Sequence, residues 1–146
     1  MKNLLVAIDR RKDAEQLMTQ AIKIAKLTDA KIWIMHVTEA EPDDFLAREA
    51  GPQYVYEKRA KERKNASLEI QKWVEEVKEK YSIDIEGLVI NGEVTKSIKN
   101  IVDERNIDLV VAGHKKKSLL YGLFTANKKK DLIDDLKVPL LAIPLV

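Results

Sequence analysis

The sequence predicts an α/β fold in which a doubly wound sheet of five parallel strands carries helices on both faces. Two observations lead to this prediction. Five short apolar segments recur along the chain, and helical periodicity fills the intervals between them. Near the C-terminus, an apolar run at 109–112 stops at Gly113, and a helical pattern then leads to a second apolar run at 138–143. Strands that alternate with helices in this way are typical of a parallel sheet.

The strands are recognised as apolar runs that are bounded by polar or turn-forming residues and are too short for a helix. They are predicted at residues 3–8, 31–37, 83–90, 109–112 and 139–143. The second run is rich in β-forming residues, and the third ends at Asn91-Gly92, where Gly92 is expected to supply a turn. Pro144 follows the last run and cannot donate a ladder hydrogen bond, so this strand is expected at an edge of the sheet.

The helices are recognised by apolar residues that recur at a spacing of three and four. They are predicted at residues 14–25, 55–81, 94–105 and 119–136. Asp13 is expected to cap the first helix. The second helix has one apolar stripe opposite a dense mix of charged side chains, and its residues 57–64 are expected to project beyond the core. Residues 38–54 precede it and predict a long loop with a helical turn at 45–49.

The composition is that of a globular chain, and residues 1–146 are expected to form a single domain. Hydrophobic residues make up 45% and charged residues 34% of the chain. Cysteine is absent, which excludes disulfides and thiolate chemistry and fits a cytoplasmic protein. With 26 basic and 24 acidic side chains, no strong overall field attracts nucleic acid. No apolar run approaches the roughly 18 residues of a membrane helix, so no membrane partner is expected either.

The loops after the strands lack the motifs of the common nucleotide and catalytic sites. Residues 9–13 contain no glycine where a dinucleotide fingerprint would begin, and no P-loop, H-E-x-x-H or G-x-S-x-G occurs. The two histidines, His36 and His114, lack the helical spacing of a metal pair and are expected to be structural, so no metal site is predicted. Because no nucleophile–base pair stands out, no catalytic residue is assigned.

Four features nevertheless occur together in a characteristic order. The first strand ends at Asp9, the second at His36-Val37, and Gly92 follows the third. V-V-A-G-H ends the fourth strand, and V-P-L-L-A-I-P lies at the C-terminus. With these features the sequence resembles a universal stress protein over essentially its whole length. The resemblance implies a Rossmann-like fold of the adenine nucleotide alpha hydrolase type. It also implies a homodimer in which the C-terminal strand meets its counterpart.

Members of this family that bind ATP carry G-x-x-G, nine further residues and then G-S/T. Their glycines let backbone N–H groups approach the phosphates, and the Ser/Thr lies at a helix N-terminus that favours an anion. On this sequence the four motif positions fall on Gly113, Lys116, Ala126 and Asn127. Only Gly113 fits the motif, although the spacing from Ala126 to Pro139 matches the family. The resemblance therefore implies a nucleotide site that has been degraded.

Other candidate residues of this site follow from the same resemblance. Asp9 matches the family aspartate near adenine and ribose, and it is equally suited to capping the next turn. Val37 matches the residue whose backbone meets adenine, while its side chain is expected in the core. Lysine triplets at Lys115–Lys117 and 128–130 are by default a solvated surface. They also give residues 113–137 seven lysines against three aspartates, and ammonium groups hold phosphate as point charges.

The sequence thus predicts a dimeric, stress-linked regulatory module that is not an enzyme and binds ATP weakly or not at all. Two alternatives stay open. One is an ATP- or AMP-binding member in which Lys115 and Lys116 replace the glycine contacts, with slow hydrolysis of the nucleotide. The other is a pure protein-interaction module that uses the helix at 55–81 and the loop before it.

Overall fold

The structure is a computed structural model that describes residues 1–8, 11–38, 52–114 and 136–145. Within these residues the chain forms five strands and three helices. The strands are β1 (Asn3–Ile8), β2 (Lys31–Thr38), β3 (Ile85–Asn91), β4 (Leu109–His114) and β5 (Leu140–Pro144). The helices are α1 (Arg11–Thr28), α3 (Pro52–Tyr81) and α4 (Val94–Glu104). None of the described helices is long and apolar enough to cross a membrane.

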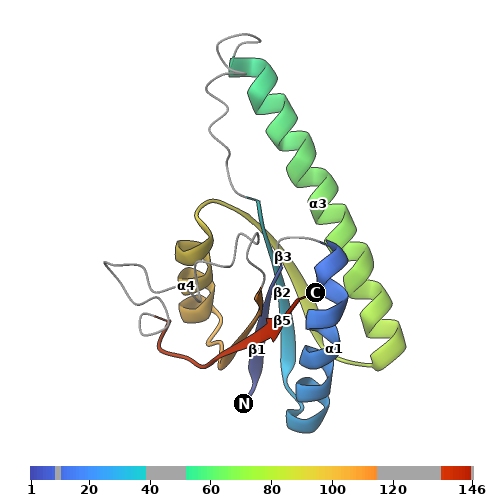
Figure 1. Cartoon of the computed structure of the whole chain (residues 1–146). Coiled ribbons are helices and arrows are strands. Elements are labelled where there is room, and N and C mark those ends of the chain that lie inside the picture. The colour runs from blue at the N-terminus through green and yellow to red at the C-terminus, as the bar shows by residue number, and fades with distance from the viewer. Residues whose placement is uncertain (9–10, 39–51, 115–135, 146) are drawn as a thin grey trace.

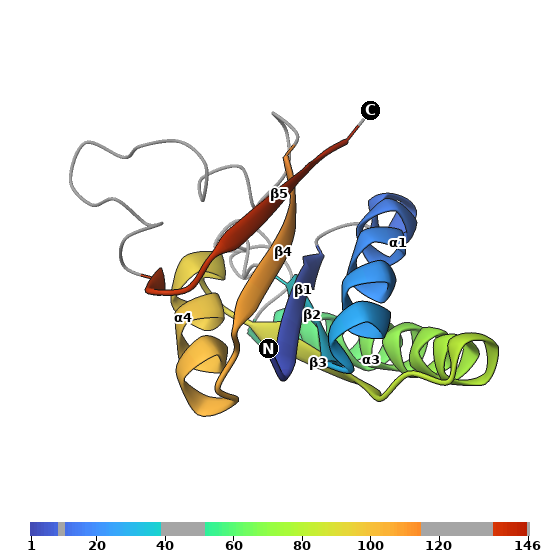
Figure 2. The same cartoon turned by 90° about the horizontal axis from the view of Figure 1, so that it is seen from below.

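All five strands are parallel and form one sheet in the order β3-β2-β1-β4-β5. α1 and α3 pack on one face of this sheet, and α4 packs on the other (Figures 1 and 2). The predicted doubly wound parallel fold is therefore confirmed. β5 lies at an edge, as Pro144 indicated.

β1 is the centre of the sheet and of the core. The side chains of Leu4, Leu5 and Val6 are 0% exposed. Leu4 and Val6 face α1 and α3, whereas Leu5 faces α4. A strand covered on both faces has no reason to alternate between apolar and polar residues. This double burial explains why β1 appears in the sequence as an unbroken apolar run.

Two helices begin earlier than the sequence predicted. α1 begins at Arg11, so Asp13 is its third residue and the expectation that Asp13 caps it is wrong. α3 begins at Pro52, inside the segment predicted as a loop. Proline suits the first helical position because no N–H partner is needed there. The turn at 45–49 and nearly all of the helix at 119–136 lie outside the described residues.

Two strands differ from their predicted bounds by two residues at one end. β4 was expected to stop before Gly113 but continues through His114, because β5 offers partners for both residues in the register Gly113↔Ile143 and His114↔Pro144. β3 begins at Ile85 and not at Ile83. Ile83 is buried but follows directly on Ser82, whose φ of 54° turns the chain after α3.

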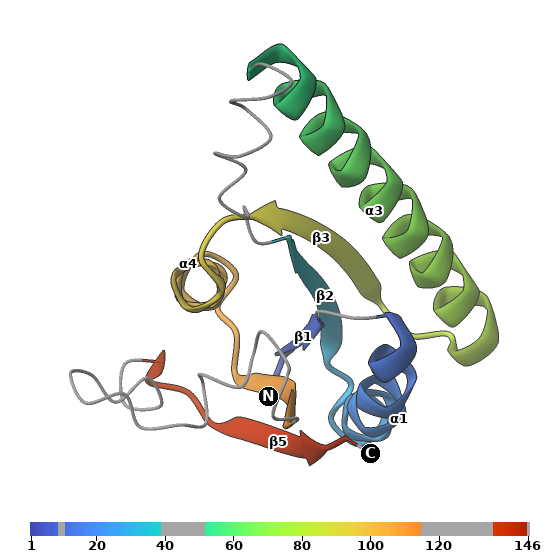
Figure 3. The same ribbon diagram turned by 45° about the horizontal axis from the view of Figure 1, so that its top comes forward.

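α3 packs on the sheet with its C-terminal half only. Ile70, Trp73 and Val74 are buried, whereas the side chains described before Ile70 are exposed or half-buried. The N-terminal half extends beyond the carboxyl ends of the strands, as predicted (Figures 1 and 3). Close packing is set by Gly87 of β3, where a Cβ would collide with Cγ2 of Ile70.

The left-handed residue after α3 generates a stability prediction. Ser82 has a φ of 54° and its N–H donates to the Lys78 carbonyl oxygen, an arrangement in which glycine is the favoured residue. We expect Ser82→Gly to raise the free energy of unfolding by about 0.5 to 1 kcal/mol, because it removes the Cβ strain. Urea denaturation measures this change.

Ser67→Gly is the matched control, because Ser67 is an exposed residue inside α3. Here the same substitution should lower stability by about 0.5 kcal/mol. Two changes of the same sign would contradict the assignment of Ser82 as the helix-terminating residue.

Candidate functional site

The candidate site lies at the carboxyl ends of β1 and β4. From β1 the chain moves outward to β2 and β3, and then returns to β4 on the other side of β1. This reversal of strand order is a topological switch point, because the connections on its two sides run over opposite faces of the sheet. Ligands of open parallel sheets bind outside the carboxyl ends of the strands at such a point.

Two of the sequence-predicted site residues flank the end of β1. On one side Ile8 pairs with His36, so Val37 lies one residue beyond this pair. On the other side the last recorded pair is Ala7 with Ala112, so Gly113 lies one residue beyond it. The fold therefore brings Val37 and Gly113 together at the carboxyl end of the sheet, although they come from two different strands.

Val37 is a core residue in its side chain. It is 2% exposed and belongs to the apolar cluster between the sheet and α4. Its side chain therefore lies in the core, as the sequence predicted. The backbone of Val37 is the part that remains for a contact at the edge of the sheet.

Gly113 has a packing partner that accounts for the glycine. A Cβ at this position would collide with Cδ1 of Leu145 and would lie 3.0 Å from its Cγ. The backbone conformation of Gly113 does not require a glycine. Among the described glycines the one with a positive φ is Gly92, at 150°, and not Gly113. The one glycine kept from the ATP motif is thus required for the packing of the C-terminal segment. Its presence alone does not indicate a phosphate site.

His36 contacts the backbone at the same carboxyl end of the sheet. Its Nδ1 lies 3.3 Å from the carbonyl oxygen of Ile8, the last residue of β1. In the tautomer that carries the proton on Nδ1, the ring donates a hydrogen bond to this carbonyl. The half-buried imidazole is thereby held against the end of the central strand.

Five further candidates lie outside the described residues and stay predictions. They are Asp9, Lys115, Lys116, Ala126 and Asn127. For His114 the structure describes the strand position but not the side chain. Within the described ranges, no three histidine or acidic side chains gather in a group that would hold a metal ion.

The sequence analysis missed Leu145 as a neighbour of the site. The signal was present, because Leu141, Ile143 and Leu145 alternate across Pro144 and all three pack toward the same core cluster. Treating Pro144 as the end of the strand hid the continuation of this alternation.

Together, the strand order and the switch point define a doubly wound α/β protein, with its candidate site at the carboxyl ends of β1 and β4. The universal stress protein family matches the chain over residues 1–144. The chain therefore belongs to the universal stress protein family.

Individual relatives agree with this assignment. A universal stress protein A homolog from Haemophilus influenzae is 24% identical over 145 residues, which cover 99% of this chain and 96% of the relative. The structure of universal stress protein UspA from Lactobacillus plantarum matches with a TM-score of 0.68 at 16% identity, over 97% of each chain. The universal stress protein from Archaeoglobus fulgidus, solved in complex with dAMP, has a TM-score of 0.57 at 16% identity over 98% of each chain. These structural matches support the fold.

The contact between Gly113 and Leu145 generates the second prediction. Gly113→Ala should lower the free energy of unfolding by about 1 to 3 kcal/mol, because the new methyl group overpacks against Leu145. In a Leu145→Ala background the same change should cost less than about 0.5 kcal/mol, because the colliding atoms are gone. Urea denaturation of the four proteins of this double-mutant cycle measures the coupling.

Leu141→Ala is the control background, since Leu141 lies on the same face of β5 but is not recorded near the Gly113 Cβ position. If Gly113→Ala costs the same in all three backgrounds, the glycine is not explained by Leu145.

Proposed function

We propose that this universal stress protein is a cytoplasmic, dimeric regulatory module that is not an enzyme and binds ATP weakly or not at all. One observation carries the proposal. Gly113, the remaining glycine of the ATP motif, is already accounted for by its packing against Leu145. The positions where ATP-binding members have glycine hold Lys116 and Ala126. No glycine of the motif is therefore left over for the phosphates.

The physical reason for weak binding is steric. Glycine lets a backbone N–H approach a phosphate closely and reach conformations with a positive φ. A Cβ at Lys116 or Ala126 obstructs this approach, and Asn127 replaces the hydroxyl residue at the expected helix N-terminus.

A second candidate function is adenine nucleotide binding with lysines as the phosphate ligands. It is supported by the relative from Archaeoglobus fulgidus, whose structure is a complex with dAMP. It is also supported by residues 113–137, which hold seven lysines against three aspartates. In this alternative Lys115 and Lys116 act as point charges in place of backbone N–H groups.

The proposed dimer pairs β5 with its counterpart in a second copy. The Val110 N–H donates to the Pro139 carbonyl oxygen at 3.0 Å. Alternation along a parallel ladder then turns the N–H groups of Leu140 and Ala142 to the outer side of the strand. Pro144, which has no N–H, also falls on this outer side. An edge strand that is apolar and carries no charge from Leu140 to Pro144 is suited to pairing with another strand.

The nucleotide proposal predicts a dissociation constant for ATP above roughly 100 μM, or no binding, by titration calorimetry with ATP and Mg²⁺. A clear low-micromolar isotherm would overturn it. The triple change Lys116→Gly, Ala126→Gly and Asn127→Ser rebuilds the family motif while Gly113 stays in place. It should improve ATP affinity at least tenfold, about 1.4 kcal/mol.

Lysine removal separates the two nucleotide accounts. If Lys115 and Lys116 clamp the phosphates, the unmodified protein binds ATP at low salt, the binding weakens as salt is added, and Lys116→Ala reduces it. If they border a degraded site, Lys116→Ala changes nothing and the triple variant gains binding. A triple variant that gains nothing would contradict the account based on lost glycines.

The dimer proposal predicts that Ala142→Pro yields a monomer. Proline at this position removes an outward N–H and leaves the pairing of β5 with β4 in place. Light scattering at micromolar concentration measures the mass, and circular dichroism checks the fold. The matched control is Val89→Pro, which makes the equivalent change on the opposite edge strand β3 and should leave the dimer intact. A monomeric unmodified protein would end the proposal.

A further inference from the structure

The outer side of β3 is the second open edge of the sheet. β3 is the first strand in the order β3-β2-β1-β4-β5, so among the described strands β2 is its one neighbour. The Ile32 N–H donates to the Asp84 carbonyl oxygen at 2.9 Å. Alternation along the ladder then directs the backbone groups of Gly87 and Val89 outward. Among the residues that the structure describes, no partner is recorded for these outward groups.

The side chains of β3 do not protect this edge. Natural sheets usually guard an open edge with lysine, proline or a bulge. β3 contains neither lysine nor proline, and its one charged residue is Glu86. Leu88, Val89 and Ile90 are half-buried apolar side chains in the second half of the strand. The edge is thus suited to receive another extended chain.

Two grooves follow the edge of β3. The first has a volume of about 240 Å³ and straddles the strand, because it is lined by Gln71 and Lys78 of α3 and by Trp33 and Arg105 on the other face. The second has a volume of about 360 Å³. It is lined by Val89 of β3 and by α3 residues that include Arg63 and Lys64.

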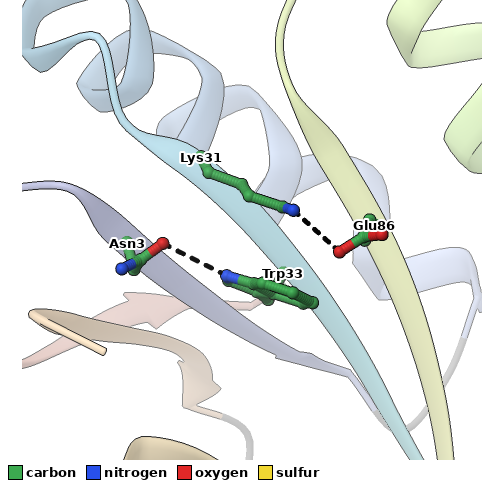
Figure 4. Close-up of polar contacts among 4 residues, drawn as sticks. All are labelled: Asn3, Lys31, Trp33 and Glu86. Atoms are coloured by element: carbon green, nitrogen blue, oxygen red, sulfur yellow. Dashed lines mark hydrogen bonds and ion pairs between the residues drawn. The ribbon is translucent and has the colours of Figure 1, made fainter. Parts of the chain in front are cut away.

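One wall of the first groove is fixed by polar contacts. The Trp33 Nε1 donates to Asn3 Oδ1 at 3.3 Å, and the Arg105 guanidinium lies 4.8 Å from the centre of the indole. Lys31 lies over the same ring at 4.1 Å and donates to Glu86 Oε2 at 2.7 Å (Figure 4). The hydrogen bond from Lys31 lowers the pKa of Glu86, which therefore stays ionised and is balanced by Lys31.

The remaining charge of the two grooves is positive. With Glu86 balanced by Lys31, the described residues that line the grooves include the cations Arg63, Lys64, Lys78 and Arg105 and no further carboxylate. None of these four forms an ion pair with a described residue. The first three come from α3, whereas the apolar Leu88 and Ile90 face the side of α4. A strand added here would meet three cations on the α3 face, and the apolar row together with Arg105 on the α4 face.

We propose that the outer edge of β3 binds an extended acidic peptide of a partner protein by strand addition. Its backbone pairs with Gly87 and Val89. Its acidic side chains meet Arg63, Lys64 and Lys78, and its apolar side chains extend the row of Leu88 and Ile90. Main-chain pairing gives affinity in this mode, and alternate side chains give specificity.

Charge and chemistry separate this partner from two others. A second copy of the chain would bring an identical set of cations to the same edge, and like charges across the contact oppose association. A nucleic acid would use the cations but not the outward N–H and carbonyl groups of Gly87 and Val89. The inference concerns a surface away from the switch point and does not depend on whether ATP binds.

The test uses a fluorescein-labelled peptide of seven residues in which glutamate alternates with valine. Fluorescence anisotropy should show binding to the unmodified protein below about 1 mM. Val89→Pro removes an outward N–H from an edge strand and should weaken binding at least tenfold. Ala142→Pro, the equivalent change in β5, should leave the affinity within twofold. No anisotropy change up to about 1 mM protein would overturn the proposal.

The charge component is tested on α3. The double variant Arg63→Glu and Lys64→Glu should weaken peptide binding at least about fivefold. Its matched control is Lys58→Glu with Lys72→Glu, which changes the net charge equally at exposed positions of α3 that do not line the grooves. Equal losses in the two double variants would show that net charge alone attracts the peptide, which contradicts the proposal.

If circular dichroism shows that the Val89→Pro variant does not fold, variants of the peptide provide the test instead. A peptide N-methylated on every residue has no N–H to donate to the edge strand and should bind at least tenfold more weakly. A peptide with lysine in place of glutamate should not bind. Equal binding of the N-methylated peptide would overturn the proposal. The proposal would also be overturned if a labelled oligothymidylate bound more tightly than the acidic peptide and kept its affinity in the Val89→Pro variant. That result would indicate nucleic acid as the partner.

Discussion

The rest of the structure depends on the complete burial of β1. Leu4, Leu5 and Val6 are all 0% exposed, and burial of each such side chain stabilises the fold by about 1.5 to 3 kcal/mol. A strand that is apolar on both faces must be covered on both faces, so helices have to pack on both sides of the sheet. The chain meets this need by adding β2 and β3 on one side of β1 and then β4 and β5 on the other. The same packing constraint therefore creates the switch point at which the candidate site lies.

The two ends of the sheet have different tasks. At the amino ends, the carboxylate of Asp108 accepts hydrogen bonds from the backbone N–H groups of Lys2 at 2.7 Å and Asn3 at 2.9 Å, which joins β1 to the start of β4. These bonds lower the pKa of Asp108. Their contribution is thus present above its unfolded pKa and is lost as pH falls through the lower folded value. The carboxyl ends of β1 and β4 lead instead into the segments that carry the candidate nucleotide residues.

Local signals in the sequence predicted the helices and strands. The features that were not predicted depend on pairing and packing between residues far apart in the chain. Each strand was predictable because a buried parallel strand is a short apolar run. The extension of β4 through His114 was not, because it depends on β5, which lies about 30 residues later in the chain. The reason for Gly113 was hidden for the same cause, since its partner Leu145 follows a proline. β3 was not recognised as an edge because the strand order is a property of the whole sheet.

Charge distinguishes the two open edges of this sheet. β5 carries no charged side chain from Leu140 to Pro144, so the proposed pairing of two copies at this strand would meet no electrostatic opposition. At the edge of β3 the outward backbone groups of Gly87 and Val89 also have no partner among the described residues, but Arg63 and Lys64 project beside them from α3. Self-pairing at that edge would place these cations against their counterparts, which is unfavourable wherever water is displaced. The projecting half of α3, which adds little to the core, thus has a role in deciding which chains the second edge accepts. In these two proposals the same sheet pairs with a second copy at β5 and binds an acidic partner at β3.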